Sequence, residues 1–304
     1  MKTVRIGTRG SPLALWQANE TSRLLRAAGF DPVIVPIKTT GDLRRDVPLA
    51  TIGGKGLFVK ELEEALDRHE IDLAVHSLKD VPSIIPDRFG LFGFLERADP
   101  RDAWLQADGL SIDALEPGAV VATSAPRRQA QLLEAYPHLK VDAIRGNVET
   151  RIAAVTSRRY EGLVLARAGL DRLGLADSIA ATFPVEEMIP AAGQGIIAFE
   201  TLHSNTLGRE AAASINHERS ALAAQCERGV LQQFGTRLDC TSCIAVHASF
   251  DGDTITIRTF VSEPDGRTAA RVTQRGTDAD ALVLSVAKEL RDLGAFVLFE
   301  RRAS

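Results

Sequence analysis

The first hundred residues alternate short apolar runs with longer amphipathic segments. The apolar runs have the length and composition of buried strands, and the amphipathic segments repeat their apolar residues at helical spacing. The strand-like runs are 4–7, 32–37, 71–75 and 91–95, and the helix-like segments are 12–28 and 57–69. This alternation predicts a largely parallel sheet that is covered by helices.

A second block of the same kind follows between two irregular stretches. Its strand-like runs are 119–122, 141–144 and 162–166, with helices starting near 126, 148 and 168. The charged, proline-broken stretch 96–102 precedes this block, and residues 189–195 lead from it to another apolar strand at 196–199. A chain that leaves one α/β lobe, builds a second and returns forms two lobes joined by two crossovers, as in hinged ligand-binding proteins.

The last ninety residues have a different pattern. After a helical region at 207–234, two alternating runs flank Asp-Gly-Asp at 251–253, which is a hairpin signal. A third strand at 268–276, an amphipathic helix at 279–293 and a last strand at 295–299 complete a small α+β domain. The predicted division is one discontinuous lobe of residues 1–97 and 195–216, a second lobe of 98–194, and a third domain of 217–304.

Polar side chains gather where the strand at 71–75 ends. The sequence HSLKDVP at 76–82 puts Lys79 and Asp80 side by side at that edge. In open α/β sheets, ligands bind outside the carboxyl ends of the strands. A solvated loop is the better interpretation of an isolated Lys-Asp pair, and a lone His76 at a strand end is more often a hydrogen-bonded structural residue.

Arginines recur near strand ends and helix starts. Guanidinium groups pair bidentately with carboxylates or phosphates, so several of them predict a substrate with several acidic groups. For any one arginine, surface ion pairing is the more common role; for the adjacent pair behind Thr123 and Ser124, we favour function. The arginines are Arg9, Arg127, Arg128, Arg145, Arg151 and Arg172.

Two short motifs leave alternatives open. The loop at 53–56, Gly-Gly-Lys-Gly, lacks the spacing of a nucleotide-binding loop, so Lys55 either reaches an anionic ligand or belongs to a plain helix-initiating turn. Cys240 and Cys243 form a CxxC pair, but a structural zinc needs four ligands and no second cysteine pair exists. We therefore predict no metal site, and leave open a buried structural cysteine or a covalent attachment point.

Composition excludes several classes of protein. The chain is 45% hydrophobic and 25% charged, with a net charge of −4, which argues against bulk nucleic-acid binding. No apolar run approaches the roughly 20 residues that span a bilayer, and the N-terminus lacks the apolar core of a signal peptide. Three cysteines suit a reducing compartment, so we expect a cytoplasmic protein without membrane contact.

Six motifs together resemble one enzyme family, the porphobilinogen deaminases (hydroxymethylbilane synthases). The resemblance covers nearly the whole chain, and six motifs in register are far more specific than any one. The motifs are TRGSPLAL at 8–15, GGKGLFVKE at 53–61, HSLKDVP at 76–82, TSAPRRQ at 123–129, RGNVETR at 145–151 and GQG at 193–195.

The resemblance implies a three-domain, monomeric enzyme of haem-type tetrapyrrole (porphyrin) biosynthesis, whose first two domains look like the lobes of a periplasmic binding protein. Such a transferase joins four porphobilinogen molecules head to tail into hydroxymethylbilane and releases ammonia each time. It works on a dipyrromethane cofactor that is made from two porphobilinogen units and held by a thioether to a cysteine of the third domain.

The resemblance also implies roles for individual residues. Asp80 matches the catalytic aspartate. The residues that match cofactor contacts are Arg9, Ser11, Ser77, Lys79, Thr123, Ser124, Arg127, Arg128, Arg145 and Gly146. The residues that match substrate contacts are Arg9, Lys55, Phe58, Arg145, Arg151, Arg172 and Gln194.

The chain departs from the family pattern at two places. The family presents a Gly-Gly-Cys-x-x-Pro-like loop at the attachment site, whereas this chain reads LDCTSC at 238–243. Counting back without gaps from Pro264 puts Cys240 at the attachment position, with Cys243 as the second choice. Glu149 stands where glycine is common, and its charge either weakens anion binding by Arg145 and Arg151 or points to solvent.

Two alternatives to an active enzyme remain. One is a two-lobed binding or sensor protein for a polycarboxylate, against which the missing signal peptide and the extra C-terminal domain count. The other is a family member that has lost activity through its altered cysteine loop. Incubation with porphobilinogen separates both from an enzyme, because neither would release ammonia or form a bilane.

Overall fold

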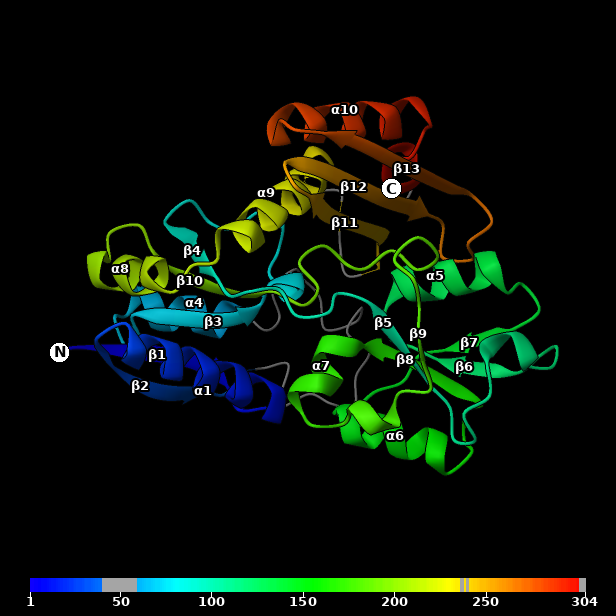
Figure 1. The fold of residues 1–304 in the computed structure, drawn as a ribbon, viewed down its shortest axis with the longest axis horizontal. Helices are drawn as coiled ribbons and strands as arrows, with labels where there is room; N and C mark the ends of the chain where they lie inside the picture. Colours follow the sequence, from blue (N-terminus) through cyan, green and yellow to red (C-terminus); the bar gives the residue numbers. More distant parts are fainter. Residues whose placement is uncertain (40–58, 236–237, 239–240, 301–304) are drawn as a thin grey trace. The chain divides into compact units, whose positions relative to one another are not determined.

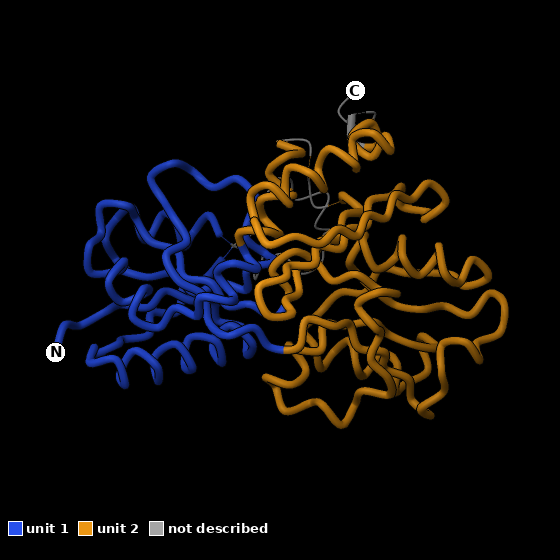
Figure 2. Tube along the Cα trace, turned by 45° about the horizontal axis from the view of Figure 1, so that its top comes forward, with its two compact units in different colours: residues 1–98, 195–224 blue, residues 99–194, 225–304 orange. Residues whose placement is uncertain are grey.

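A computed structural model describes residues 1–39, 59–235, 238 and 241–300 of the chain. The described chain divides into two compact units, residues 1–98 with 195–224 and residues 99–194 with 225–304 (Figure 2). Each unit contains one five-stranded sheet, and the second unit also contains a sheet of three strands. The contacts thus group residues 225–304 with 99–194, and the separate third domain stays a prediction.

The sheet of the first unit is mixed. Its strands are β1 (Lys2–Arg9), β2 (Phe30–Ile37), β3 (Leu73–Ser77), β4 (Phe89–Phe94) and β10 (Ile197–Leu202). In the order β2-β1-β3-β10-β4, the first three strands are parallel and β10 is antiparallel to both of its neighbours. The sequence predicted the parallel strands. The strand β10 runs the other way because it enters the sheet from the second crossover rather than through a helix.

Helices cover both faces of this sheet (Figure 1). They are α1 (Pro12–Ala27), α4 (Lys60–Asp67) and α8 (Thr206–Ser214). The core on one face includes Val75 of β3 with apolar residues of α1 and α8, and the core on the other face includes Ala74 with Leu62 and Leu66 of α4. Residues two apart on a strand share a face, so His76 lies on the α4 face with Ala74.

The second unit repeats this sheet pattern in the order β7-β6-β8-β5-β9. Its strands are β5 (Asp102–Leu105), β6 (Val120–Ala122), β7 (Lys140–Asp142), β8 (Gly162–Ala166) and β9 (Ala181–Thr182), and its helices are α5 (Pro126–Ala135), α6 (Val148–Thr156) and α7 (Arg167–Arg172). Three strands are parallel, and β5 is antiparallel to β8 and β9. The two five-stranded sheets therefore share a topology, with the antiparallel strand arriving from a crossover in each.

The C-terminal part carries the small sheet β11 (Cys243–Asp251), β12 (Thr254–Ser262) and β13 (Ala269–Gly276), covered by α10 (Ala279–Asp292). The helix α9 (Glu218–Gln233) leads into it from the first unit. The hairpin prediction is confirmed, but the strand predicted at 295–299 is wrong, because α11 (Val297–Glu300) forms there instead. The preceding Phe296 stacks on Phe234 with ring centroids 4.0 Å apart, so the apolar residues here pack against the end of α9. Among the described residues, the small sheet has three strands.

The two crossover segments touch each other at the edge of the first unit. The Ala98 amide donates to the Gly195 carbonyl at 3.1 Å. Gly195 has a φ of +87°, and a Cβ there would lie 2.5 Å from the Ala98 carbonyl oxygen. Glycine is therefore required at this position both by the backbone conformation and by the close approach of the other crossover.

Candidate active site

A small cavity lies at the carboxyl edge of the first unit's sheet. The parallel strands β1 and β3 both end there, and Ser11 caps α1 beside them by accepting a hydrogen bond from the Ala14 amide. The cavity has a volume of about 70 Å³. Its walls include Arg9, Ser11, Gln17, His76, Ser77 and Asp80. Four of these six residues were predicted as site residues from the sequence, and the fold brings them together.

Asp80 ends a single 3-10 turn, η1 (Leu78–Asp80), that follows β3 directly. Leu78 is buried and anchors the turn, while Lys79 and Asp80 are exposed. Within the described part of the chain, no group is hydrogen-bonded to the Asp80 carboxylate. Ser77 is held by Gln17, whose Nε2 donates to the Ser77 Oγ at 2.7 Å. The turn thus presents a carboxylate at the cavity wall on a rigid strand end.

A buried hydrogen-bonded pair lies behind the cavity. The Nε2 atom of His76 is 3.0 Å from Oε2 of Glu200, and both side chains are almost fully buried. The prediction that His76 is hydrogen-bonded is confirmed, but the sequence reasoning missed Glu200. The available signal was a single carboxylate inside the apolar run IIAFETL at 196–202, where an unpaired charge would be costly.

Two predicted arginines of the second unit share one carboxylate. Asp102 accepts from Arg127 at 2.6 and 3.0 Å and from the Arg128 Nε at 2.9 Å, and all three side chains are buried. Gln194 donates its Nε2 to Asp102 at 2.9 Å and accepts from the Arg127 Nη2 at 3.0 Å. The two guanidinium groups hold the pKa of Asp102 far below its usual range against the opposing effect of burial. One positive charge of this group remains uncompensated by Asp102.

A second pair of arginines lies close to this group. Burial lowers the pKa of Arg151, and the nearby charge of Arg145 lowers it further; Arg151 in turn contributes to lowering the pKa of buried Arg128. The Arg151 Nε donates to the Gly146 carbonyl at 2.9 Å, and no ion pair of Arg145 or Arg151 occurs among the described residues. In addition to burial, neighbouring arginines lower the pKa of Arg151 and Arg128 because their positive charges repel. Such a local excess of positive charge favours the binding of anions.

The loop before α6 needs its glycine. Gly146 has a φ of +110°, and a Cβ there would lie 2.9 Å from the Thr150 Cβ. Asn147 then caps α6 by accepting from the Thr150 amide at 2.9 Å. Glu149 is exposed in the first turn of this helix, which agrees with the interpretation that its side chain points to solvent.

The other predicted polar residues of this unit are partly tied to the backbone. Thr123 is buried at the end of β6, and the Ser124 Oγ donates to the Ile144 carbonyl. Arg172 ends α7, and burial lowers its pKa to about 10. Thr123, Ser124 and the two arginine pairs all belong to the stretch from the end of β6 to α6, so the fold gathers most of the predicted anion-binding residues at one sheet edge.

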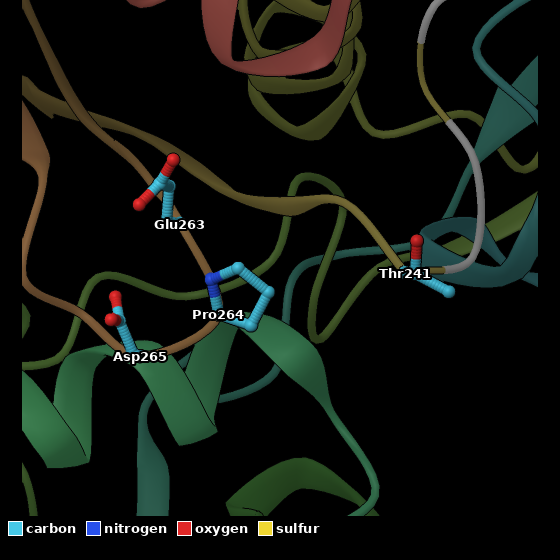
Figure 3. Close-up of a pocket in the computed structure, with 4 residues that line it drawn as sticks. All are labelled: Thr241, Glu263, Pro264 and Asp265. Carbon is cyan, nitrogen blue, oxygen red and sulfur yellow. The ribbon is translucent and has the colours of Figure 1, made fainter. Parts of the chain in front are cut away.

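Of the two candidate attachment cysteines, Cys243 lies among the described residues. Cys243 begins β11, is fully buried, and packs in a cluster with Ala130, Ile189 and Phe260. Cys240 lies outside the described residues, as do Lys55 and Phe58. An open depression of about 540 Å³ adjoins the cysteine loop and is lined by Thr241, Glu263, Pro264 and Asp265 (Figure 3). Its two carboxylates come from the β12–β13 turn, and no arginine is among the described residues that line it.

Among residues 1–39, 59–235, 238 and 241–300, no cluster of three histidine, cysteine or carboxylate side chains could hold a metal ion. No helix in that same part of the chain is both long enough and apolar enough to cross a membrane.

The chain is similar to known proteins along most of its length. Residues 4–209 match the family described as "Porphobilinogen deaminase, dipyromethane cofactor binding domain", and residues 221–292 match "Porphobilinogen deaminase, C-terminal domain". The porphobilinogen deaminase of Trichlorobacter lovleyi is 46% identical over 96% of this chain and 92% of its own length. That of Geobacter metallireducens is 45% identical over 97% of this chain and 93% of its own length.

A solved structure of a methionine-binding protein is also similar, with 13% identity over 73% of this chain and 94% of that one, at a TM-score of 0.46. The two family matches and the identities of 45–46% agree with each other over both parts of the chain. On that basis the chain belongs to the porphobilinogen deaminase family.

Proposed function

We propose that Asp80 is the catalytic carboxylate of this chain and that the arginines of the second unit bind the carboxylates of its ligands. The activity is that of its family: a transferase that deaminates four porphobilinogen molecules and joins them head to tail into hydroxymethylbilane, in tetrapyrrole biosynthesis. The observation that carries the proposal is the cavity in which Asp80 stands with Arg9, Ser11 and Ser77.

The dipyrromethane cofactor of the family fits the chemistry of the residues present. It carries acetate and propionate groups, and the second unit holds two buried arginines for one carboxylate, with Arg145 and Arg151 beside them. Guanidinium groups that are already fixed by hydrogen bonds bind carboxylates with little further loss of side-chain freedom. The resemblance to the family assigns cofactor contacts to Arg127 and Arg128 in the second unit and to Arg9, Ser11 and Ser77 in the first. When bound, the cofactor supplies the pyrrole ring to which the first substrate is joined.

Asp80 stabilises the charge that develops in the reaction. Loss of ammonia from the aminomethyl group of porphobilinogen leaves a positively charged pyrrole. A fixed carboxylate near the pyrrole N–H stabilises that charge more strongly than it stabilises the neutral ring, which lowers the barrier. The position of Asp80 on η1, anchored by buried Leu78, supplies the required rigidity.

Cys240 is the proposed attachment point of the cofactor. Its alternative, Cys243, is fully buried in the core between β11 and α5, where a thioether would have no room without disrupting the packing. Intact-mass measurement of the denatured protein tests the assignment. We expect one dipyrromethane of added mass on the wild type and on Cys243→Ser, and none on Cys240→Ser; the reverse result for the two variants would contradict it.

We also infer a cytoplasmic monomer with three domains. The chain has three cysteines, too few for a disulfide framework, and the described ones, Cys226 and Cys243, are buried, which suits a reducing compartment. The monomeric state and the third domain rest on the resemblance to the family.

Incubation with porphobilinogen tests the function. We expect ammonia release and formation of hydroxymethylbilane in a ratio of four to one, with the cofactor mass retained by the protein. A chain that binds porphobilinogen without releasing ammonia would be a binding protein. A chain that carries the cofactor but makes no bilane would be an inactive member of the family.

A further inference from the structure

His76 contributes an acceptor atom to the Asp80 cavity that the function proposed above does not use. Its ring lies in the cavity wall, and its Nε2 is 3.0 Å from the buried carboxylate of Glu200. In the described residues, no hydrogen bond involves the other ring nitrogen, Nδ1. One side of the imidazole is therefore fixed inside the unit, and the other is available at the cavity.

The sheet fixes the geometry of this pair. His76 on β3 pairs with Ala198 on β10, and Glu200 pairs with Ala74. Residues that are opposite each other, or two apart, on antiparallel strands share a face, so His76 and Glu200 are diagonal neighbours on the face covered by α4. Both backbones belong to the central strands of the sheet, which leaves the imidazole little freedom to turn.

Glu200 sets the proton on the ring. A carboxylate accepts hydrogen bonds, so in the neutral imidazole the proton is on Nε2 and Nδ1 carries a lone pair. The Oε1 of Glu200 is buried and has no hydrogen-bond partner in the described chain, so its negative charge is directed at His76. Glu63 of α4 lies in the same cluster, and burial together with the charge of Glu200 raises its pKa to about 7.

Porphobilinogen has one polar group to which the proposed function assigns no residue. The arginines take its two carboxylates and Asp80 takes its pyrrole N–H, which leaves the aminomethyl group, a cation with three N–H donors. The cavity volume of about 70 Å³ accommodates a few non-hydrogen atoms, which suits an aminomethyl group and excludes the whole ring with its side chains.

We propose that Nδ1 of His76 accepts a hydrogen bond from the aminomethyl ammonium group of the substrate, and that Glu200 is a positioning residue that holds the ring in the required tautomer. The inference rests on the proposed function, because it takes porphobilinogen as the ligand. The proposal assigns recognition of the aminomethyl group, which leaves as ammonia, to this cavity. It assigns recognition of the two carboxylates, which remain in the product, to the arginines.

Two substitutions of His76 separate the hydrogen bond of Nε2 to Glu200 from the acceptor function of Nδ1 at the cavity. In His76→Gln the side-chain amide replaces Nε2 and still donates to Glu200, but the cavity acceptor is lost. In His76→Asn the amide replaces Nδ1, and Glu200 loses its partner. His203→Gln is a matched control, since His203 is an exposed histidine of the same unit that packs edge-on against Phe92.

The kinetic test compares porphobilinogen with an analogue that has a methyl group in place of the aminomethyl group. For His76→Gln we expect KM for porphobilinogen to rise about tenfold, the size of a hydrogen bond to a charged group. The inhibition constant of the methyl analogue should change less than about twofold, and His203→Gln should change neither. Cofactor loading is checked by intact mass in every variant. An unchanged KM in His76→Gln, or an equal loss of affinity for both compounds, would overturn the proposal.

Nitrogen NMR of the labelled wild-type protein gives a readout that does not depend on turnover. We expect the neutral form of the His76 ring to carry its proton on Nε2. A neutral ring protonated on Nδ1 cannot accept the hydrogen bond and would overturn the proposal whatever the activity. If the tautomer is as expected but the wild type makes no bilane, the function proposed for the chain is at fault.

Discussion

The two sheet edges that gather the predicted site residues differ in the charge that each leaves in excess. At the edge of the first unit, Asp80 and Arg9 line the cavity with His76, and the buried carboxylate of Glu200 lies 3.0 Å from His76. At the edge of the second unit, Asp102 is the carboxylate among Arg127 and Arg128, and Arg145 and Arg151 add more positive charge. One edge offers acceptors to N–H groups, and the other offers donors to carboxylates.

Porphobilinogen, on which the family acts, carries both kinds of group: N–H donors on its pyrrole and aminomethyl nitrogens, and two carboxylates. The shared topology of the two sheets shows that the difference does not come from the fold, because the same strand order presents both edges. It comes from a few side chains at strand ends, and substitutions of those side chains can break the comparison.

The largest expected effect is the loss of stability on substitution of Asp102, the carboxylate that pairs with both buried arginines at the second edge. Asp102→Asn would leave two buried guanidinium groups without an anion, so we expect a loss of about 3–5 kcal/mol of unfolding free energy. Denaturant unfolding followed by circular dichroism measures it. The exposed pair of Asp108 with Arg158 is the control, and Asp108→Asn should cost less than about 1 kcal/mol. Similar costs for the two variants would show that the buried cluster is not a stabilising unit.

The next effect is on ligand affinity at the second edge. Arg151 is held by the Gly146 carbonyl and has no ion pair among the described residues, so its charge is available to a ligand. We expect Arg151→Gln to raise KM for porphobilinogen at least about tenfold, the usual cost of a charge-assisted hydrogen bond. The exposed Arg267 in the β12–β13 turn serves as control, and Arg267→Gln should leave KM within about twofold. Equal effects of the two variants would mean that only net charge matters.

The smallest effect is a pH dependence of stability in the first unit. The pKa of Glu63 is raised to about 7 by burial and by the charge of Glu200, with smaller opposing effects of His76 and Arg88. A raised carboxyl pKa means that the folded state binds more protons than the unfolded state between pH 4.5 and 7, so this contribution to stability falls as pH rises through that range.

Glu63→Gln removes this dependence. We expect the variant to gain on the order of 1–2 kcal/mol over the wild type at pH 8, and the gain to vanish near pH 5. Urea unfolding of both proteins at several pH values measures the difference. A constant difference across this range would show that Glu63 titrates normally in the folded protein.

The sequence predicted most of the fold and the edge residues, but not their partners. Strands such as β1, β3 and β8 are recognisable as short apolar runs, and Asp80 because it follows β3 directly. The sequence did not predict β5 or the two-residue β9, because both are short and β5 directly follows a charged stretch. The pairs that set the charge of each edge join residues 25 positions apart in Asp102–Arg127 and 124 apart in His76–Glu200. Such pairs are fixed by strand order, which no local pattern encodes. The apolar run at 295–299 fits a strand or a helix equally well. In the structure, residues Val297–Glu300 form a helix next to the stacked rings of Phe296 and Phe234.

The most direct test of the difference between the two edges is the turnover of Asp80→Asn. This substitution keeps the size of the side chain and removes its charge, so we expect porphobilinogen consumption to fall at least about a hundredfold. The intact mass should still include the cofactor, and KM should change little. Turnover close to that of the wild type would contradict the assignment of Asp80 as the group that stabilises the reacting pyrrole.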